Sequence, residues 1–191
     1  GMVLGTVAMV VISLIDYNWV LKFYWLIYAF NLLLLLLVET PLGDGANGAV
    51  RWLNLGGFRF QPSELCKLCL ILFFAKFFEK YKDILNTWKI LGLSALLFGL
   101  PAFLVVNQPD LSTTISLCVI FVTVIFAAGL SWKLIGGALV VGIPAVVVFI
   151  SLIMQPDQTI VEDYQRRRIL AWLNPAVYAD EAYQQQNSIT A

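Results

Sequence analysis

Apolar residues gather into six stretches along the chain, and short polar segments separate them. The stretches cover residues 1–15, 20–38, 63–79, 88–107, 110–129 and 134–154. A helix that crosses a bilayer needs about 20 apolar residues, and all but the first and third stretches come close to this length. The third is interrupted by Glu64, Lys67 and Lys76, although the alternation of the loops favours it as a span. The pattern predicts an all-α protein, a polytopic transmembrane helix bundle of about six spans in one domain.

The composition agrees with a membrane protein and excludes several kinds of chemistry. Hydrophobic residues make up 60% of the 191 positions and charged residues 13%, whereas a soluble domain carries roughly 25% charge. The net charge is zero, so no basic field indicates a nucleic-acid partner. The chain has no histidine, which excludes Ser-His and Cys-His catalysis and removes the most common metal ligand.

The positive residues divide between the loops by type. Residues 16–22, 76–89 and 131–133 contain only lysines as positive residues. Short Lys-rich loops face the cytoplasm, so we expect residues 39–62 to form an extracellular loop and residues 155–191 to begin a large one. These two outer segments contain only arginines, namely Arg51, Arg59, Arg166, Arg167 and Arg168. Because guanidinium groups bind phosphate through two hydrogen bonds, the arginines favour a phosphate-bearing ligand; lipid headgroup contacts are the alternative.

Two segments share the order Gln, Pro and an acid, at residues 61–64 and 108–110. Proline suits the first position of a helix and the helix dipole favours an acid in the first turn, so capping alone explains both segments. Lys67 follows Glu64 by three residues, which places both on one face of a helix. With Asp110 from another helix they would form a charged triad that either holds helices together or lines a hydrated cavity. Because desolvation offsets the attraction within a buried ion pair, we favour the cavity.

Aromatic residues accompany the arginines of the first predicted extracellular loop. Trp52, Phe58 and Phe60 lie close in sequence to Arg51 and Arg59. Such residues are typical of the aromatic belt at a membrane interface. The alternative interpretation is that they stack on a sugar ring.

Four segments together resemble one family. They are the pattern N-G-A-x-R-W-L…F-Q-P-S-E-x-x-K around residues 48–67, Q-P-D-L at 108–111, S-W-K-L-I at 131–135, and residues 164–175 with 184–191. Their order and separation are similar to the SEDS family (shape, elongation, division and sporulation; RodA, FtsW and SpoVE), and to the RodA elongation proteins more than to the FtsW division proteins. Ser112 is a departure, because the family frequently has Gly at this position.

The resemblance implies a ten-helix enzyme of the bacterial cytoplasmic membrane, a peptidoglycan glycosyltransferase. Such an enzyme polymerises lipid II into glycan strands in cell-wall elongation and cell-shape control, or in cell division. It works among membrane lipids with a class B penicillin-binding protein. By this analogy residues 1–191 run from the second helix to the seventh, and we expect them to be an internal part of a longer chain and to be inactive alone.

The resemblance also implies roles for single residues. Trp52 matches a tryptophan needed for activity, and the charged network of the family's central cavity matches three positions. The candidate substrate-binding or cavity residues are Arg51, Trp52, Glu64, Lys67 and Asp110. The aspartate that the resemblance implies as catalytic belongs to a T-D-F-I-F pattern with no counterpart in this sequence, so no catalytic residue is assigned.

Glycosyl transfer from a lipid pyrophosphate needs a carboxylate base and a positive group that stabilises the departing pyrophosphate. Arg166, Arg167 and Arg168 are candidate pyrophosphate contacts, and a divalent cation is the other means of stabilisation. A flippase for the lipid-linked precursor is the alternative function, but it needs a polar path to both faces, and the inner halves of the predicted helices are apolar. A non-catalytic membrane scaffold for a penicillin-binding protein is the third possible function.

Overall fold

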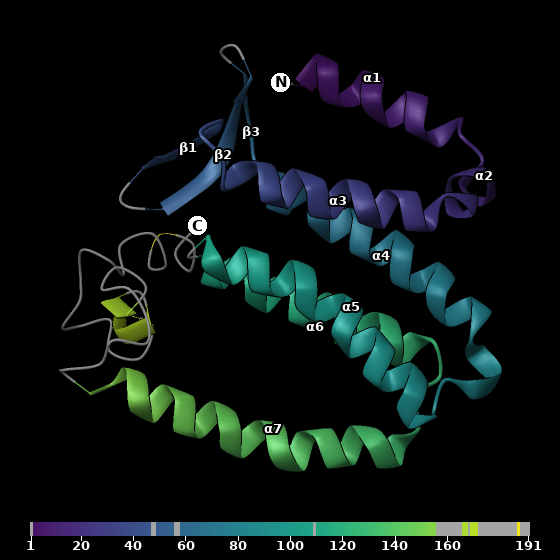
Figure 1. Ribbon diagram of the computed structural model, residues 1–191, viewed down its shortest axis with the longest axis vertical. Helices are drawn as coiled ribbons and strands as arrows, with labels where there is room; N and C mark the ends of the chain where they lie inside the picture. Colours follow the sequence, from purple (N-terminus) through teal and green to yellow (C-terminus); the bar gives the residue numbers. More distant parts are fainter. Residues whose placement is uncertain are drawn as a thin grey trace. The chain divides into compact units, whose positions relative to one another are not determined.

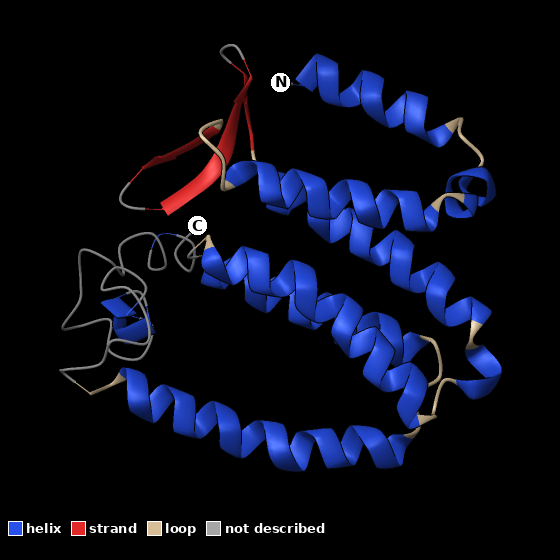
Figure 2. Ribbon diagram, viewed as in Figure 1, coloured by secondary structure: helices blue, strands red, loops and turns tan. Residues whose placement is uncertain are grey.

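The computed structural model describes residues 2–46, 49–55, 58–108 and 110–155, together with Arg166, Arg167, Ile169, Leu170, Ala171 and Asn187. Most of these residues are helical, and one three-stranded sheet interrupts the series of helices (Figure 2). The elements are α1 (Met2–Ser13), α2 (Tyr17–Lys22), α3 (Tyr24–Val38), β1 (Gly43–Ala46), β2 (Ala49–Leu55), β3 (Phe58–Phe60), α4 (Pro62–Lys80), the 3-10 helix η1 (Lys82–Ile84), α5 (Trp88–Asn107), α6 (Leu111–Ala127) and α7 (Trp132–Ile153).

Each of the six predicted apolar stretches contains a helix, but the prediction of six spans is not confirmed. Among the described helices, α5 and α7 are long and apolar enough to cross a membrane. The helices α3 and α6 are apolar but have only 15 and 17 residues, because Phe23 separates α3 from α2 and Asp110 precedes α6 as its cap. The helix α4 has 19 residues, but its charged residues lower its hydropathy.

The chain divides into two compact units, Gly1–Leu130 and Ser131–Ala191. In the first unit α4 packs against α3 and α6, and α5 packs against α3 and α6 (Figure 1). Four phenylalanines of α4 form the centre of this packing, and their side chains are fully buried: Phe73, Phe74, Phe77 and Phe78. Their spacing gives α4 one broad apolar face, which is why this helix lies in the middle of the unit although it also carries charge.

A tyrosine of α3 completes the hydrogen bonding of α5. Pro101 lies inside α5 and has no N–H group, so the carbonyl oxygen of Leu97, four residues earlier, has no partner within the helix. The hydroxyl of Tyr28 donates a hydrogen bond to this oxygen at 2.8 Å, and all three residues are buried. The contact joins α3 to α5 and satisfies a polar group that would otherwise be unpaired in the core.

The segment between α3 and α4 forms an antiparallel sheet in the order β1-β2-β3, which corrects the purely helical prediction. β1 and β3 have only four and three residues, and the seven residues of β2 do not alternate strictly between apolar and polar types, so no period-2 pattern indicates the strands. Leu53 of β2 is buried, and the sheet packs on α3 and α4 (Figure 1). A Cβ atom at Gly43 would collide with the carbonyl oxygen of Val38, so the close approach of β1 to α3 requires glycine.

Candidate functional site

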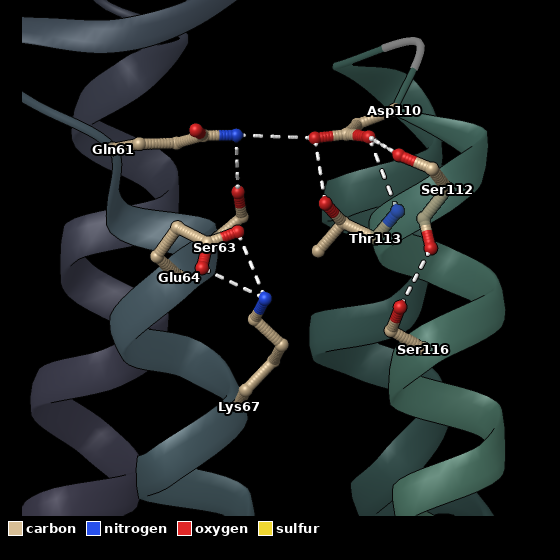
Figure 3. A network of polar contacts seen from close by, with 8 residues as sticks. All are labelled: Gln61, Ser63, Glu64, Lys67, Asp110, Ser112, Thr113 and Ser116. Atoms are coloured by element: carbon tan, nitrogen blue, oxygen red, sulfur yellow. Dashed lines mark hydrogen bonds and ion pairs between the residues drawn. The ribbon is translucent and has the colours of Figure 1, made fainter. Parts of the chain in front are cut away.

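A polar network joins the segments that precede α4 and α6. Gln61 is the N-cap residue of α4 and Asp110 that of α6. The Nε2 group of Gln61 donates to Oδ2 of Asp110 at 3.2 Å and to Oγ of Ser63 at 3.0 Å. Figure 3 shows Gln61 and Asp110 facing each other between the two helices. Gln61 was not predicted as a site residue. Its place in the segment 61–64, which repeats the order Gln, Pro and acid of residues 108–110, was the signal in the sequence that could have identified it.

Asp110 is a buried cap whose two carboxylate oxygens are both occupied. The residue is 4% exposed. Its Oδ1 atom accepts hydrogen bonds from the backbone N–H of Thr113 and the hydroxyl of Ser112, both at 3.2 Å, and Oδ2 accepts from the hydroxyl of Thr113 at 2.8 Å as well as from Gln61. The prediction that this acid lies in the first helical turn is wrong by one position, because α6 begins at Leu111. Asp110 therefore fixes the start of α6 and its distance from α4.

Glu64 and Lys67 form the ion pair that their spacing predicted. The Nζ group of Lys67 lies 2.7 Å from Oε2 and 2.9 Å from Oε1 of Glu64, and Figure 3 shows both side chains on the first turns of α4. The Glu64 side chain is 56% exposed and that of Lys67 28%. Among the described contacts Asp110 bonds to neither of them. The expected triad is thus an accessible ion pair and a separate buried carboxylate, and Gln61 and Ser63 bond on the side of Asp110 and not to the ion pair among the described contacts.

Arg51 ties the sheet to the ends of the helices. The register of β1 and β2 shifts between Asp44 and Gly45, which leaves Arg51 as the extra residue of a β-bulge, a feature that redirects side chains. Its Nε group donates to the carbonyl oxygen of Gln108 at 3.2 Å, and the side chain of Gln108 donates to the carbonyl oxygen of Leu35 at 3.1 Å. The 39–62 segment and the turn before α6 therefore lie at the same end of the first unit, as the alternation of loops predicted.

Trp52 lies on the face of the sheet that points away from the helices. Neighbouring residues of a strand point to opposite faces, and the next residue, Leu53, is buried against the helices. Trp52 is 40% exposed and is paired with Asp44 across the strands. The structure thus places Arg51 and Trp52 in one strand, with Arg51 reaching the helix ends and Trp52 on the outer face.

The predicted arginine cluster belongs to the second unit. The Nε group of Arg166 donates to the carbonyl oxygen of Ile153 at 3.1 Å, at the end of α7, and Arg167 is exposed. Arg168 lies outside the described residues, as does most of the segment 155–191. Their assignment as pyrophosphate contacts stays a prediction.

No group of three or more His, Cys, Asp or Glu side chains is close enough to hold a metal ion within the part of the chain that the structure describes. The oxygens of Asp110 accept hydrogen bonds and Glu64 is paired with Lys67. We therefore assign no metal ligand among these residues.

Known proteins are similar to this sequence over most of its length. The model of a family described as Cell cycle protein (FtsW, RodA and SpoVE) matches residues 1–191. The peptidoglycan glycosyltransferase MrdB of Escherichia coli K12 is 37% identical over 153 residues, which make up 79% of this chain and 39% of that protein. The probable peptidoglycan glycosyltransferase FtsW of Marinobacter nauticus is 32% identical over 194 residues, covering 98% of this chain and 45% of that protein.

Solved structures agree with this similarity. A chain of a peptidoglycan synthase complex, studied for its coordination of polymerization and crosslinking, matches with a TM-score of 0.71 and 32% identity over 92% of this chain and 49% of that chain. The rod shape determining protein RodA of Thermus thermophilus matches with a TM-score of 0.64 and 33% identity over 76% of this chain and 46% of that chain. This chain spans less than half the length of the curated relatives it matches. Since the family model matches from the first residue to the last, the chain belongs to the FtsW, RodA and SpoVE family of cell cycle proteins.

Proposed function

We propose that the protein to which these residues belong is a peptidoglycan glycosyltransferase, which polymerises lipid II into glycan strands in cell-wall elongation and cell-shape control. The observation that carries the proposal is the 37% identity over 153 residues to a protein named as a peptidoglycan glycosyltransferase. The match of the structure to a chain of a peptidoglycan synthase complex supports a second part of the proposal. This part is that the protein works with a class B penicillin-binding protein.

The proposal places the protein in the bacterial cytoplasmic membrane as a multi-pass protein. The six helix-forming apolar stretches and the two helices of sufficient length, α5 and α7, support it. The short lysine-rich loops at residues 16–22, 76–89 and 131–133 support an orientation with the sheet on the outer side, because such loops face the cytoplasm. In this orientation the polar network lies where a lipid-linked sugar presents its pyrophosphate to the outer surface.

The geometry of the network supports different roles for its members. Glu64 and Lys67 are the accessible charged groups, so they are the residues that would line a hydrated cavity and contact substrate. Asp110 has four hydrogen bonds on its two oxygens, which leaves it little capacity to accept a proton from substrate. We assign it a positioning role, with Arg51 holding the sheet beside it. The outer arginines 166–168 would bind pyrophosphate.

A flippase would need a polar path through the bundle. Beyond Lys67, toward the C-terminal end of α4, the four fully buried phenylalanines between residues 73 and 78 lie in the part of the helix that packs against α3 and α6. The charged residues of α4 lie toward its two ends, with Glu64 and Lys67 at the sheet end and the Lys76–Glu79 pair toward the other. No charged residue lies between Lys67 and Lys76, and this apolar interval supports chemistry at a surface over transport between surfaces.

The test is polymerisation of purified lipid II by the protein expressed from its complete reading frame, with glycan strands measured by gel electrophoresis. We expect polymer from the wild type, and less polymer from Glu64→Gln and Lys67→Met variants that fold normally. A protein that makes no polymer, alone or with its penicillin-binding partner, would contradict the proposal. Movement of a fluorescent lipid-linked precursor across vesicles without polymer would support the flippase instead.

A further inference from the structure

The outer face of the sheet gathers four polar or aromatic side chains from all three strands. The register pairs Asp44 with Trp52 and Asn54 with Arg59. Trp52 and Asn54 are two residues apart in β2, so they and their partners share the face opposite the buried Leu53. Trp52, Asn54 and Arg59 are all exposed. We call Asp44, Trp52, Asn54 and Arg59 the outer platform.

An ion pair crosses the outer platform. The Nη2 group of Arg59 lies 2.8 Å from Oδ2 of Asp44, with side chains 66% and 30% exposed, so the pair reaches from β3 to β1 across β2. Charged groups are costly in hydrocarbon, and this pair therefore places the face of Trp52 in water or among headgroups. This excludes a position of Trp52 in the hydrocarbon and leaves its face accessible from the aqueous side.

The charge of the outer platform indicates what it binds. Arg59 and Asp44 neutralise each other, so a phosphate or a strongly charged peptide would gain little by replacing the partner that each already has. What the surface offers is a flat apolar ring beside a fixed guanidinium, a carboxylate oxygen and an amide. A pyranose matches this set, because its C–H face stacks on an indole ring while its hydroxyl and acetamido groups bond to planar polar side chains at the edge.

We propose that the outer platform binds an N-acetylated hexosamine unit of the growing glycan strand. The proposal rests on the proposed function and names a binding site for its product. The strand β2 that carries Trp52 also carries Arg51, which contacts Gln108 beside the polar network. A saccharide on the platform would therefore be held at the same end of the first unit as the network, and a strand anchored there would remain bound between successive additions.

The experiment uses the purified protein from the complete reading frame, in lipid nanodiscs, and a β-1,4-linked tetramer of N-acetylglucosamine as a soluble probe in calorimetric titration. Trp52→Ala should weaken binding by roughly tenfold or more, as for truncation of an aromatic contact at the centre of a site. Trp52→Phe should retain most of the affinity, and Arg59→Ala should weaken it less than Trp52→Ala. Trp88→Ala is the matched control, because Trp88 is 81% exposed and begins α5 at the end remote from Gln108; its affinity should equal that of the wild type.

The same preparations should be tested for lipid II polymerisation and for the length of the strands. We expect shorter strands from Arg59→Ala while synthesis of the first bonds persists. A wild type that does not bind the tetramer at millimolar concentration, or a Trp52→Ala variant that binds it like the wild type, would overturn the platform. If polymer is nevertheless made, only this inference fails; if no polymer is made while the tetramer binds through Trp52, the proposed function fails and the saccharide site stands.

Discussion

The hydrogen bond between Tyr28 and α5 gives a prediction whose size follows from the structure. The substitution Tyr28→Phe removes the hydroxyl that donates to the Leu97 carbonyl oxygen at 2.8 Å. It keeps the ring, which stacks on Phe73 with centroids 4.5 Å apart. Because Pro101 supplies no N–H group, the carbonyl is then buried without a donor, and an unpaired buried acceptor costs about 1–3 kcal/mol. We expect Tyr28→Phe to lower the free energy of unfolding by about 2 kcal/mol.

A double-mutant cycle isolates this effect. In a Pro101→Ala background the new N–H group at position 101 donates to the Leu97 carbonyl oxygen within α5. The cost of Tyr28→Phe should then fall to about 0.5–1 kcal/mol. This is no more than the net contribution of an ordinary hydrogen bond, because the carbonyl oxygen keeps a donor within the helix. Unfolding of the full-length protein by SDS in mixed micelles, followed by circular dichroism, measures all four proteins. Tyr17→Phe is the control, since Tyr17 is 67% exposed. An equal cost of Tyr28→Phe in both backgrounds would refute the reasoning, because the carbonyl would then not depend on Tyr28.

Three further predictions follow from the network and the sheet. Asp110→Ala should lower the free energy of unfolding by about 1–2 kcal/mol through loss of the N-cap, measured by the same SDS titration, and an unchanged value would remove its positioning role. Glu64→Gln should change that free energy by less than about 0.5 kcal/mol, because the Glu64 side chain is 56% exposed and ion pairs of exposed groups contribute little; a large loss would make the pair structural. Arg51→Met should increase hydrogen exchange of the amides of residues 43–60 more than Arg51→Lys does, because only the lysine can still donate to the Gln108 carbonyl oxygen. Equal exchange in both variants would contradict the role of Arg51 in holding the sheet to the helix ends.

The polar site was predicted in part. The Glu64–Lys67 pair follows from spacing, since residues three apart on a helix are neighbours whatever surrounds the helix. The partner of Asp110 did not follow, because Gln61 lies 49 residues away and the same acid would satisfy the sequence pattern as an isolated cap. Arg51 was recognised as a charged loop residue, but its contact with Gln108 depends on a bulge that no residue type specifies. The sheet itself was missed because β1 and β3 are very short and the residues of β2 do not alternate strictly between apolar and polar types.

The sequence by itself determined where the helices form, which charges lie on one face of α4, and the family to which the chain belongs. These properties depend on local periodicity and on residue order, which the chain carries without folding. The tertiary structure alone decided that the Tyr28 hydroxyl satisfies the carbonyl released by Pro101, that Arg51 reaches Gln108, and that Trp52 faces away from the helices. The first two contacts join residues 69 and 57 positions apart, and the orientation of Trp52 depends on strand pairing. All three are therefore fixed only when packing brings the elements together, and burial makes an unpaired polar group costly.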